Sequence, residues 1–135
     1  MTNAVLEKTV YVYNFDFLPD MRLTENKRKA QSTSYMSYHS MSTESREMWG
    51  WLFRHKRIPH FDVKVGLEWT IYFESWRSAY DPDNVALALK PVVDALKDVS
   101  VIKDDSGKYI SHISYSVDID KRKPDRTTLR IIVKE

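Results

Sequence analysis

The chain has 135 residues, of which 42% are hydrophobic and 30% charged, and it contains no cysteine. This length fits one domain of about 150 residues, and the composition is that of a globular chain rather than a disordered one. The lack of cysteine excludes disulfide scaffolds, cysteine-ligated zinc and thiol catalysis. No apolar run reaches the roughly 18 residues of a membrane span, and the first residues show no signal-peptide pattern, so we expect a soluble, cytoplasmic protein without a membrane partner.

The net charge of +2 is the sum of segments of opposite sign. Residues 21–60 carry eight Lys or Arg against three Glu, residues 121–135 carry six against two acidic residues, and residues 81–105 carry six Asp against three Lys. A basic surface around carboxylates suits a metal-dependent enzyme acting on nucleic acid, because it attracts phosphates and holds divalent cations. Ordinary solvated charge explains the same counts, and charge alone favours that simpler interpretation.

The first half of the chain predicts a strand, a loop and a helix. Apolar and aromatic residues alternate over residues 9–18, which indicates a strand. Residues 19–41 show no sustained period, and we expect them to form a mobile basic loop. A helix is predicted over residues 43–56, with acidic residues early and basic residues late. Its residues at helical spacing are Met48, Trp51, Leu52 and His55.

The next two elements are a strand and a helix with clear boundaries. Strict alternation over residues 61–73 predicts a strand with one buried and one wet face. Asp81 and Pro82 then open a helix, because Asp is a good N-cap and Pro is tolerated at the first helical position. Pro91 lies inside this helix, where we expect a kink or a break. The core stripe of the helix consists of Val85, Leu89, Val92 and Leu96.

The last two predicted elements are strands over residues 109–119 and 127–134, which we expect to pair as an antiparallel hairpin. The order strand, loop, helix, strand, helix, strand, strand predicts an α+β fold. We expect a single domain over residues 1–135, with a mixed or antiparallel sheet of about four strands and two main helices packed on one of its faces.

The segment Asp81-Pro82-Asp83-Asn84 places two carboxylates and an amide at the start of a helix, directly after a strand. Oxygen ligands of this kind suit Mg²⁺ or Mn²⁺. An EF-hand calcium loop is excluded, because apolar residues occupy the later positions where that loop needs further ligands and a glycine. A capped helix start explains the same four residues and, on these residues alone, is the favoured interpretation.

Two further features extend this motif. Lys90 follows Asp83 by seven residues and so lies on the same side of the helix, where it could neutralise charge on a phosphoryl transition state. The alternative for Lys90 is an i,i+4 ion pair with Asp94. The pair Asp104-Asp105 lies in the turn before the third strand, and neighbouring side chains of extended chain point to opposite sides, so one of the two is expected to join the motif. Turn formation is the alternative for this pair.

In combination, Asp81-Pro82-Asp83-Asn84, the Lys-Pro-Val-Val-Asp-Ala-Leu segment over residues 90–96 and the Asp104-Asp105-Ser106 turn resemble the RusA family of Holliday-junction resolvases, which is common in phages and prophages. The match covers about residues 77–117. The resemblance implies a RusA-like endonuclease domain that acts as a homodimer in the cytoplasm of a bacterial or phage-infected cell. It also implies binding of four-way DNA junctions and paired symmetric nicking in recombination and repair, with Mg²⁺ or Mn²⁺ as cofactor.

The resemblance also assigns roles to residues. Asp81, Asp83 and Asp105 would hold the metal and act in catalysis with Lys90, and Asn84 and Asp104 would support the site. In the family the lysine follows the second aspartate by four residues rather than seven, so Lys90 lies nearly one turn further along the helix. The basic residues expected to contact DNA are Lys27, Arg28, Lys29, Arg77 and Lys108.

Two other function classes remain open. One is a non-catalytic nucleic-acid-binding protein with a nuclease-like fold, in which aromatic side chains near basic residues stack on bases. The aromatic residues considered for this role are Tyr35, Tyr38, Trp76 and Tyr80. The other is a purely structural module. The four histidines show no metal-ligand spacing and are interpreted as surface or packing residues.

Overall fold

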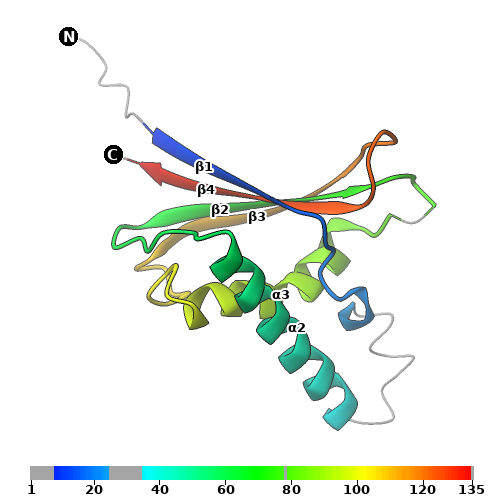
Figure 1. Ribbon diagram of the computed structural model, residues 1–135, viewed down its shortest axis with the longest axis horizontal. Coiled ribbons are helices and arrows are strands. Elements are labelled where there is room, and N and C mark those ends of the chain that lie inside the picture. The colour runs from blue at the N-terminus through cyan, green and yellow to red at the C-terminus, as the bar shows by residue number, and fades with distance from the viewer. Residues whose placement is uncertain (1–7, 25–34, 78, 135) are drawn as a thin grey trace.

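The structure, a computed structural model, describes residues 8–24, 35–77 and 79–134, except for the side chains of residues 35–37 and 134. It is an α+β domain in which two helices cover one face of a four-stranded sheet (Figure 1). Within the described residues, no helix is long and apolar enough to cross a membrane. The elements in chain order are β1 (Lys8–Phe15), a short 3-10 helix (Met21–Leu23), α2 (Tyr35–His55), β2 (Val65–Phe73), α3 (Pro82–Asp98), β3 (Ile110–Ile119) and β4 (Arg126–Lys134).

The sheet is mixed, with the strand order β1-β4-β2-β3. β4 pairs antiparallel with both β1 and β2, whereas β2 and β3 are parallel. A parallel pair needs a crossover connection, and α3 provides it by returning the chain from the end of β2 to the start of β3. The start of α3 therefore lies at the carboxyl end of the β2/β3 pair, and its end lies at the amino end of that pair (Figure 1).

The expected hairpin of the last two strands is wrong. β4 inserts between β1 and β2, so β3 and β4 are separated by β2. Burial explains this placement, because Leu129 and Ile131 are fully buried on the helix side and Ile132 is only 6% exposed on the other side. β3 has a single buried side chain, Ile110, which is typical of a strand at the edge of a sheet. A short connection favours a hairpin, but here the apolar faces determine the neighbour.

The expected long loop over residues 19–41 is shorter than predicted. Asp20 begins the 3-10 helix, with its carboxylate accepting a hydrogen bond from the Arg22 backbone N–H at 3.0 Å. Leu23 from this turn is 1% exposed and belongs to the core. α2 starts at Tyr35, eight positions before the predicted start. Residues 25–34 lie outside the described residues, and with them the predicted DNA contacts Lys27, Arg28 and Lys29.

The buried face of α2 also differs from the predicted stripe. Trp49 and Phe53 are 0% and 1% exposed, whereas Met48 and Trp51 are 42% and 62% exposed. Leu52 is buried as expected, and His55 is exposed. Trp49, Leu52 and Phe53 share one side of the helix by i,i+3 and i,i+4 spacing, and this side faces the sheet. The helix is therefore rotated relative to the sequence expectation.

The core between the sheet and α3 agrees with the sequence pattern. The predicted stripe of α3 is fully buried, and the alternate residues of β2 that face it are 1% exposed or less. α3 continues past Pro91 without a break. The residues packed together here are Val65, Leu67, Trp69, Ile71, Phe73, Val85, Leu89, Val92 and Leu96. Burial of each large apolar side chain stabilises the fold by about 1.5–3 kcal/mol, so this layer fixes the position of the α3 N-terminus relative to β2 and β3.

Candidate functional site

Asp81 and Asp83 lie at the N-terminus of α3 with exposed side chains. Asp81 has the extended backbone of an N-cap residue, with φ −67° and ψ 153°, and its carbonyl accepts a hydrogen bond from the Val85 N–H at 3.0 Å. Its carboxylate makes no capping hydrogen bond. Pro82 occupies the first turn, as predicted. The carboxylate of Asp81 is thus not used to cap the helix, which removes part of the simpler interpretation of this motif.

A pocket of about 230 Å³ is lined by Asp81, the first of these two carboxylates. It lies at the carboxyl end of the β2/β3 pair, where α3 begins, and crevices at such strand ends are frequent ligand sites in open α/β sheets. Trp76 is 71% exposed, and the Tyr80 ring packs at 6.1 Å from the Phe73 ring. The pocket combines an exposed indole with a free carboxylate. Its lining residues are Trp76, Ala79, Tyr80, Asp81, Pro82 and Val117.

Asp104 and Asp105 lie at the opposite end of α3. The 17 residues of this helix span about 25 Å, and the acidic pair follows its C-terminus (Figure 1). Asp104 is engaged locally, because its Oδ1 accepts the Asp105 N–H at 2.9 Å. Among the described residues, no three His, Asp or Glu side chains are grouped closely enough to hold a metal ion. The expected joining of Asp81, Asp83 and Asp105 within one protomer is therefore not found, because residues that flank one helix lie at its two ends.

Asp120 lies at the same sheet end as Asp81, since its N–H donates to the Phe73 carbonyl at 3.0 Å. It is not a free third ligand. Its Oδ1 accepts the Arg122 backbone N–H at 3.0 Å, and its Oδ2 accepts from the Arg126 guanidinium at 2.9 Å. These bonds hold the pKa of Asp120 at about 2. The carboxylate therefore fixes the β3–β4 turn rather than completing a metal site.

Lys90 is exposed and lies two turns beyond Asp83, about 10 Å along α3. The alternative pairing with Asp94 is not what the structure shows, because the Asp94 carboxylate lies 4.0 Å from the Arg46 guanidinium of α2. Asn84 is half-buried beside the two carboxylates. Lys90 thus keeps its predicted side of the helix without a carboxylate partner among the described residues.

The two predicted DNA contacts that the structure describes lie at opposite ends of the sheet. Arg77 is exposed in the connection between β2 and α3, next to Trp76. Lys108 is exposed before β3, with its ammonium 5.5 Å from the centre of the Tyr109 ring. Arg77 therefore accompanies Asp81 and Asp83, whereas Lys108 accompanies Asp105.

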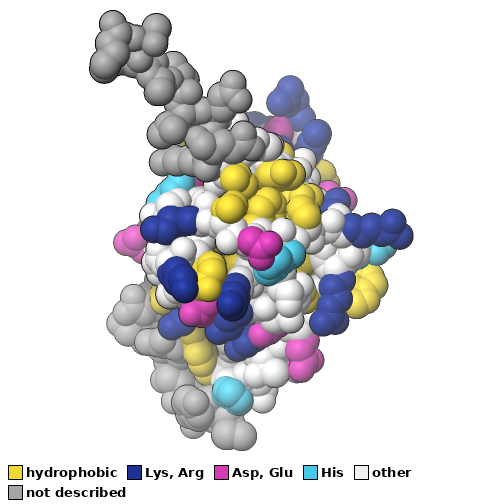
Figure 2. Space-filling view, turned by 90° about the vertical axis from the view of Figure 1, so that its left-hand side faces the viewer, with side chains coloured by type: hydrophobic (Ala, Val, Ile, Leu, Met, Phe, Trp, Pro, Cys, Tyr) yellow, Lys and Arg dark blue, Asp and Glu magenta, His cyan; other side chains and the backbone are white. Residues whose placement is uncertain are grey.

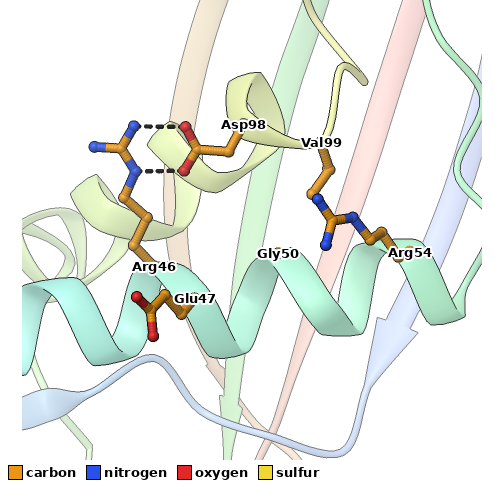
Figure 3. A pocket seen from close by; sticks show the side chains of 6 residues that line it. All are labelled: Arg46, Glu47, Gly50, Arg54, Asp98 and Val99. Carbon is orange, nitrogen blue, oxygen red and sulfur yellow. Dashed lines mark hydrogen bonds and ion pairs between the residues drawn. The ribbon is translucent and has the colours of Figure 1, made fainter.

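A second pocket, of about 260 Å³, lies where the C-terminal ends of α2 and α3 approach each other (Figure 3). The Arg46 guanidinium donates a hydrogen bond to each carboxylate oxygen of Asp98, with 2.6 Å between Nη2 and Oδ1. This holds the pKa of Asp98 below its ordinary value and offsets the unfavourable placement of a carboxylate at a helix C-terminus. The Arg54 side chain reaches toward Val99 on the opposite side of the pocket from the ion pair.

Sequence reasoning missed a cluster at the end of α2. Trp51 and His55 were noted only for their helical spacing and were given no functional role, but they line an open pocket together with Arg54 and Arg57. The signal that points to it is the basic run Arg54-His55-Lys56-Arg57 directly after a tryptophan. No protein-family model matches the chain, and a comparison with curated proteins gives no match.

Proposed function

We propose that the chain is a metal-dependent endonuclease that resolves four-way DNA junctions, as its resemblance to the RusA resolvases implies. The observation that carries this proposal is the pair of exposed carboxylates at the start of α3, Asp81 and Asp83, of which Asp81 lines an open pocket at the carboxyl end of two parallel strands. Mg²⁺ is commonly bound by one or two carboxylates and completes its shell with water and substrate phosphate. Asp81 and Asp83 fit this requirement, and Asn84 lies next to them.

Positive charge near the two carboxylates supports a phosphate-bearing substrate. The β3–β4 turn lies at the same end of the sheet as the β2–α3 connection (Figure 1), and the Glu74 N–H donates to the Asp125 carboxylate at 2.8 Å, which ties the two segments together. The exposed side chains Arg77, Lys121, Arg122 and Lys123 belong to these segments. Basic side chains at this end would attract the DNA backbone toward Asp81 and Asp83.

The third ligand of the proposed site needs a second protomer. Within one chain Asp105 lies a helix length away from Asp81 and Asp83, and Asp120 is held by two arginines. The proposed homodimer would bring Asp105 of one copy to Asp81 and Asp83 of the other. A bound ion would polarise the scissile phosphate and lower the pKa of the attacking water. Lys90, exposed on the same side of α3, would contact a substrate long enough to follow the helix.

The test compares cleavage of a synthetic four-way junction and of a linear duplex with the same sequence, in Mg²⁺, Mn²⁺ and EDTA. Paired nicks in the junction alone, lost in EDTA, are the expected result. Asp83→Asn should reduce cleavage more than about 100-fold while junction binding is kept, because the variant loses a metal-binding charge and adds no bulk. Asp16→Asn, at an exposed carboxylate after β1, is the matched control. Cleavage by Asp83→Asn at the wild-type rate would refute the assignment.

A non-catalytic nucleic-acid-binding protein is the second candidate. The observation that favours it is the separation of the three aspartates within one chain, together with the exposed Trp76 ring. Of the other aromatic residues considered for base stacking, Tyr38 and Tyr80 are half-buried, and the side chain of Tyr35 lies outside the described residues. Tight junction binding without product in either metal would favour this candidate. A purely structural module predicts no DNA affinity at low salt.

A further inference from the structure

The C-terminal end of α2 carries an exposed aromatic platform. Trp51 is 62% exposed, and its ring lies parallel to the His55 ring, with 5.5 Å between the centroids and 10° between the planes. These two side chains line an open pocket of about 400 Å³ together with Arg54 and Arg57. Volumes of roughly 300–1,000 Å³ are typical of small-molecule sites.

Arg57 takes a backbone conformation that normally belongs to glycine. Its φ is 54°, and it closes α2 as the Arg57 N–H donates to the Arg54 carbonyl at 3.0 Å and the Ile58 N–H to the Phe53 carbonyl at 3.5 Å. Glycine dominates this position of the helix-ending motif, because a β-carbon is strained there. The conformation turns the chain back so that the Arg57 side chain lies beside Trp51 in the pocket.

The arginines at this end differ in how their charge is balanced. Arg46 is neutralised by Asp98, as Figure 3 shows. Within residues 8–24, 35–77 and 79–134, neither Arg54 nor Arg57 lies within ion-pair distance of a carboxylate, and the charge of Arg54 acts on Asp98 only as a minor contribution to the lowered pKa of that carboxyl. Basic residues in a last helical turn complement the helix dipole, which accounts for charge at this position. The dipole does not account for an exposed indole that stacks on an imidazole in a pocket also lined by two arginines.

Around the pocket, exposed basic side chains outnumber exposed carboxylates, which include Asp62 and Asp105. Figure 2 faces the end of the molecule where α2 and α3 terminate, and Lys and Arg side chains are spread around it. The exposed basic residues of the segments that meet at this end are Arg54, Lys56, Arg57, Lys64, Lys103 and Lys108. Aromatic rings combined with a basic groove form the usual recognition surface for single-stranded nucleic acid, because every base has a face that stacks.

We propose that this pocket binds an unpaired nucleotide of single-stranded nucleic acid. The Trp51–His55 platform stacks on the base, and Arg54 and Arg57 contact the adjoining phosphates. The pocket lies a helix length away from Asp81 and Asp83, so this inference does not rest on the proposed nuclease activity. Binding at this site requires no metal.

The test measures the affinity of a fluorescein-labelled oligo-dT 12-mer by fluorescence anisotropy in EDTA, which separates binding from cleavage. Trp51→Ala should weaken binding about tenfold, and Trp51→Phe should keep most of it, because a stacked base is worth that much and phenylalanine still stacks. Arg54→Gln/Arg57→Gln should weaken binding and flatten its salt dependence. Met48→Ala, at an exposed apolar residue of the same helix outside the pocket, is the matched control.

An abasic 12-mer with the same backbone separates stacking from charge. The expected result is that Trp51→Ala weakens binding of oligo-dT but not of the abasic strand. Equal affinity of Trp51→Ala and the wild type for oligo-dT would overturn the proposal, as would an equal loss for both strands. Thymidine monophosphate is the last probe. If it competes with a dissociation constant equal to that of the 12-mer, the pocket serves a free nucleotide and the assignment to a strand is wrong.

Discussion

A single residue, Asp120, joins the ends of three strands. Asp120 follows β3, and its backbone N–H donates to the carbonyl of Phe73, the last residue of β2. Its carboxylate oxygens accept hydrogen bonds from Arg122 and from Arg126 at the start of β4. The Arg122 backbone bond is the largest cause of the low pKa, followed by the bond from Arg126. Because the pKa of this carboxylate is shifted by folding, the free energy of unfolding depends on pH, in a direction set by the sign of the shift.

The pKa of the Asp120 carboxyl is about 2 in the folded state, against an ordinary value of 3.8 for an aspartate. Because the pKa is lower in the folded state, the contribution of Asp120 to the free energy of unfolding is complete above about pH 4 and is lost as the pH falls toward 2. Asp120→Asn should therefore lower the urea midpoint at pH 7, and its difference from the wild type should shrink between about pH 4 and pH 2. Glu47→Gln, at an exposed carboxylate of α2, is the matched control. A difference that stays constant with pH would contradict this role.

For single residues of the candidate site, local sequence signals predict some positions and not others. Asp81, Pro82 and Asp83 were placed at a helix start by local signals, and the structure places them there. The position of Asp105 depends on the path of the chain after α3, which no local signal encodes. The exposure of Trp51 was not predictable for a related reason, because helical spacing does not say which of several apolar residues faces the sheet.

The orientation of α2 can be tested through two tryptophans that lie two positions apart. Trp49 is 0% exposed and packs edge-on against Phe15 at 5.2 Å, whereas Trp51 is 62% exposed. Trp49→Ala should destabilise the fold by about 3–5 kcal/mol, because it leaves a large cavity. Trp51→Ala should change stability by less than about 0.5 kcal/mol, as surface substitutions do. Urea unfolding of both variants measures this contrast, and similar losses would contradict the observed orientation of the helix.

The two helices illustrate why one orientation was predictable and the other was not. In α3 the apolar residues form a single stripe, so its buried face follows from the sequence. In α2 apolar residues lie on more than one side, and packing against α3 decides between them. Gly50 is buried at this contact, and a β-carbon there would lie 3.4 Å from Val99 Cγ1. A close helix approach selects the side of α2 that carries the glycine, and this selection is visible only in three dimensions.

At the scale of the whole molecule, the proposed shared site makes a prediction about mixtures of two inactive variants. Asp83→Asn and Asp105→Asn should each be inactive as homodimers. In a mixed dimer one site loses both aspartates and the other keeps both. After subunit exchange, an equal mixture should therefore recover about a quarter of the wild-type sites. Junction nicking by the mixture, compared with each variant alone, measures this recovery.

Two outcomes would contradict the shared site. A mixture no more active than its components would mean that no site combines Asp83 of one copy with Asp105 of another. Full activity of Asp105→Asn by itself would remove Asp105 from the site. A chain that stays monomeric at micromolar concentration in a sedimentation experiment would also count against the dimer.

The fold class was predictable because it depends on the number and type of elements, which periodicity reveals for β2, α3, β3 and β4. Strand order was not, because sequential strands are neighbours only about two-thirds of the time. The strands between residues 110 and 134 alternate in the same way, and only the burial of Leu129, Ile131 and Ile132 separates the central strand from the edge strand.

The central position of β4 also has a consequence for synthesis on the ribosome. β4 is the last of the described strands, and it is the one that joins β1 to β2. Until it emerges, β2, α3 and β3 can assemble, but β1 has no partner in the sheet, and β2 presents an open edge. The nascent chain thus carries two unpaired strand edges while most of its core is already complete, and such edges are templates for aggregation. A ribosome that stalls before residue 126 would hold the protein in this exposed state.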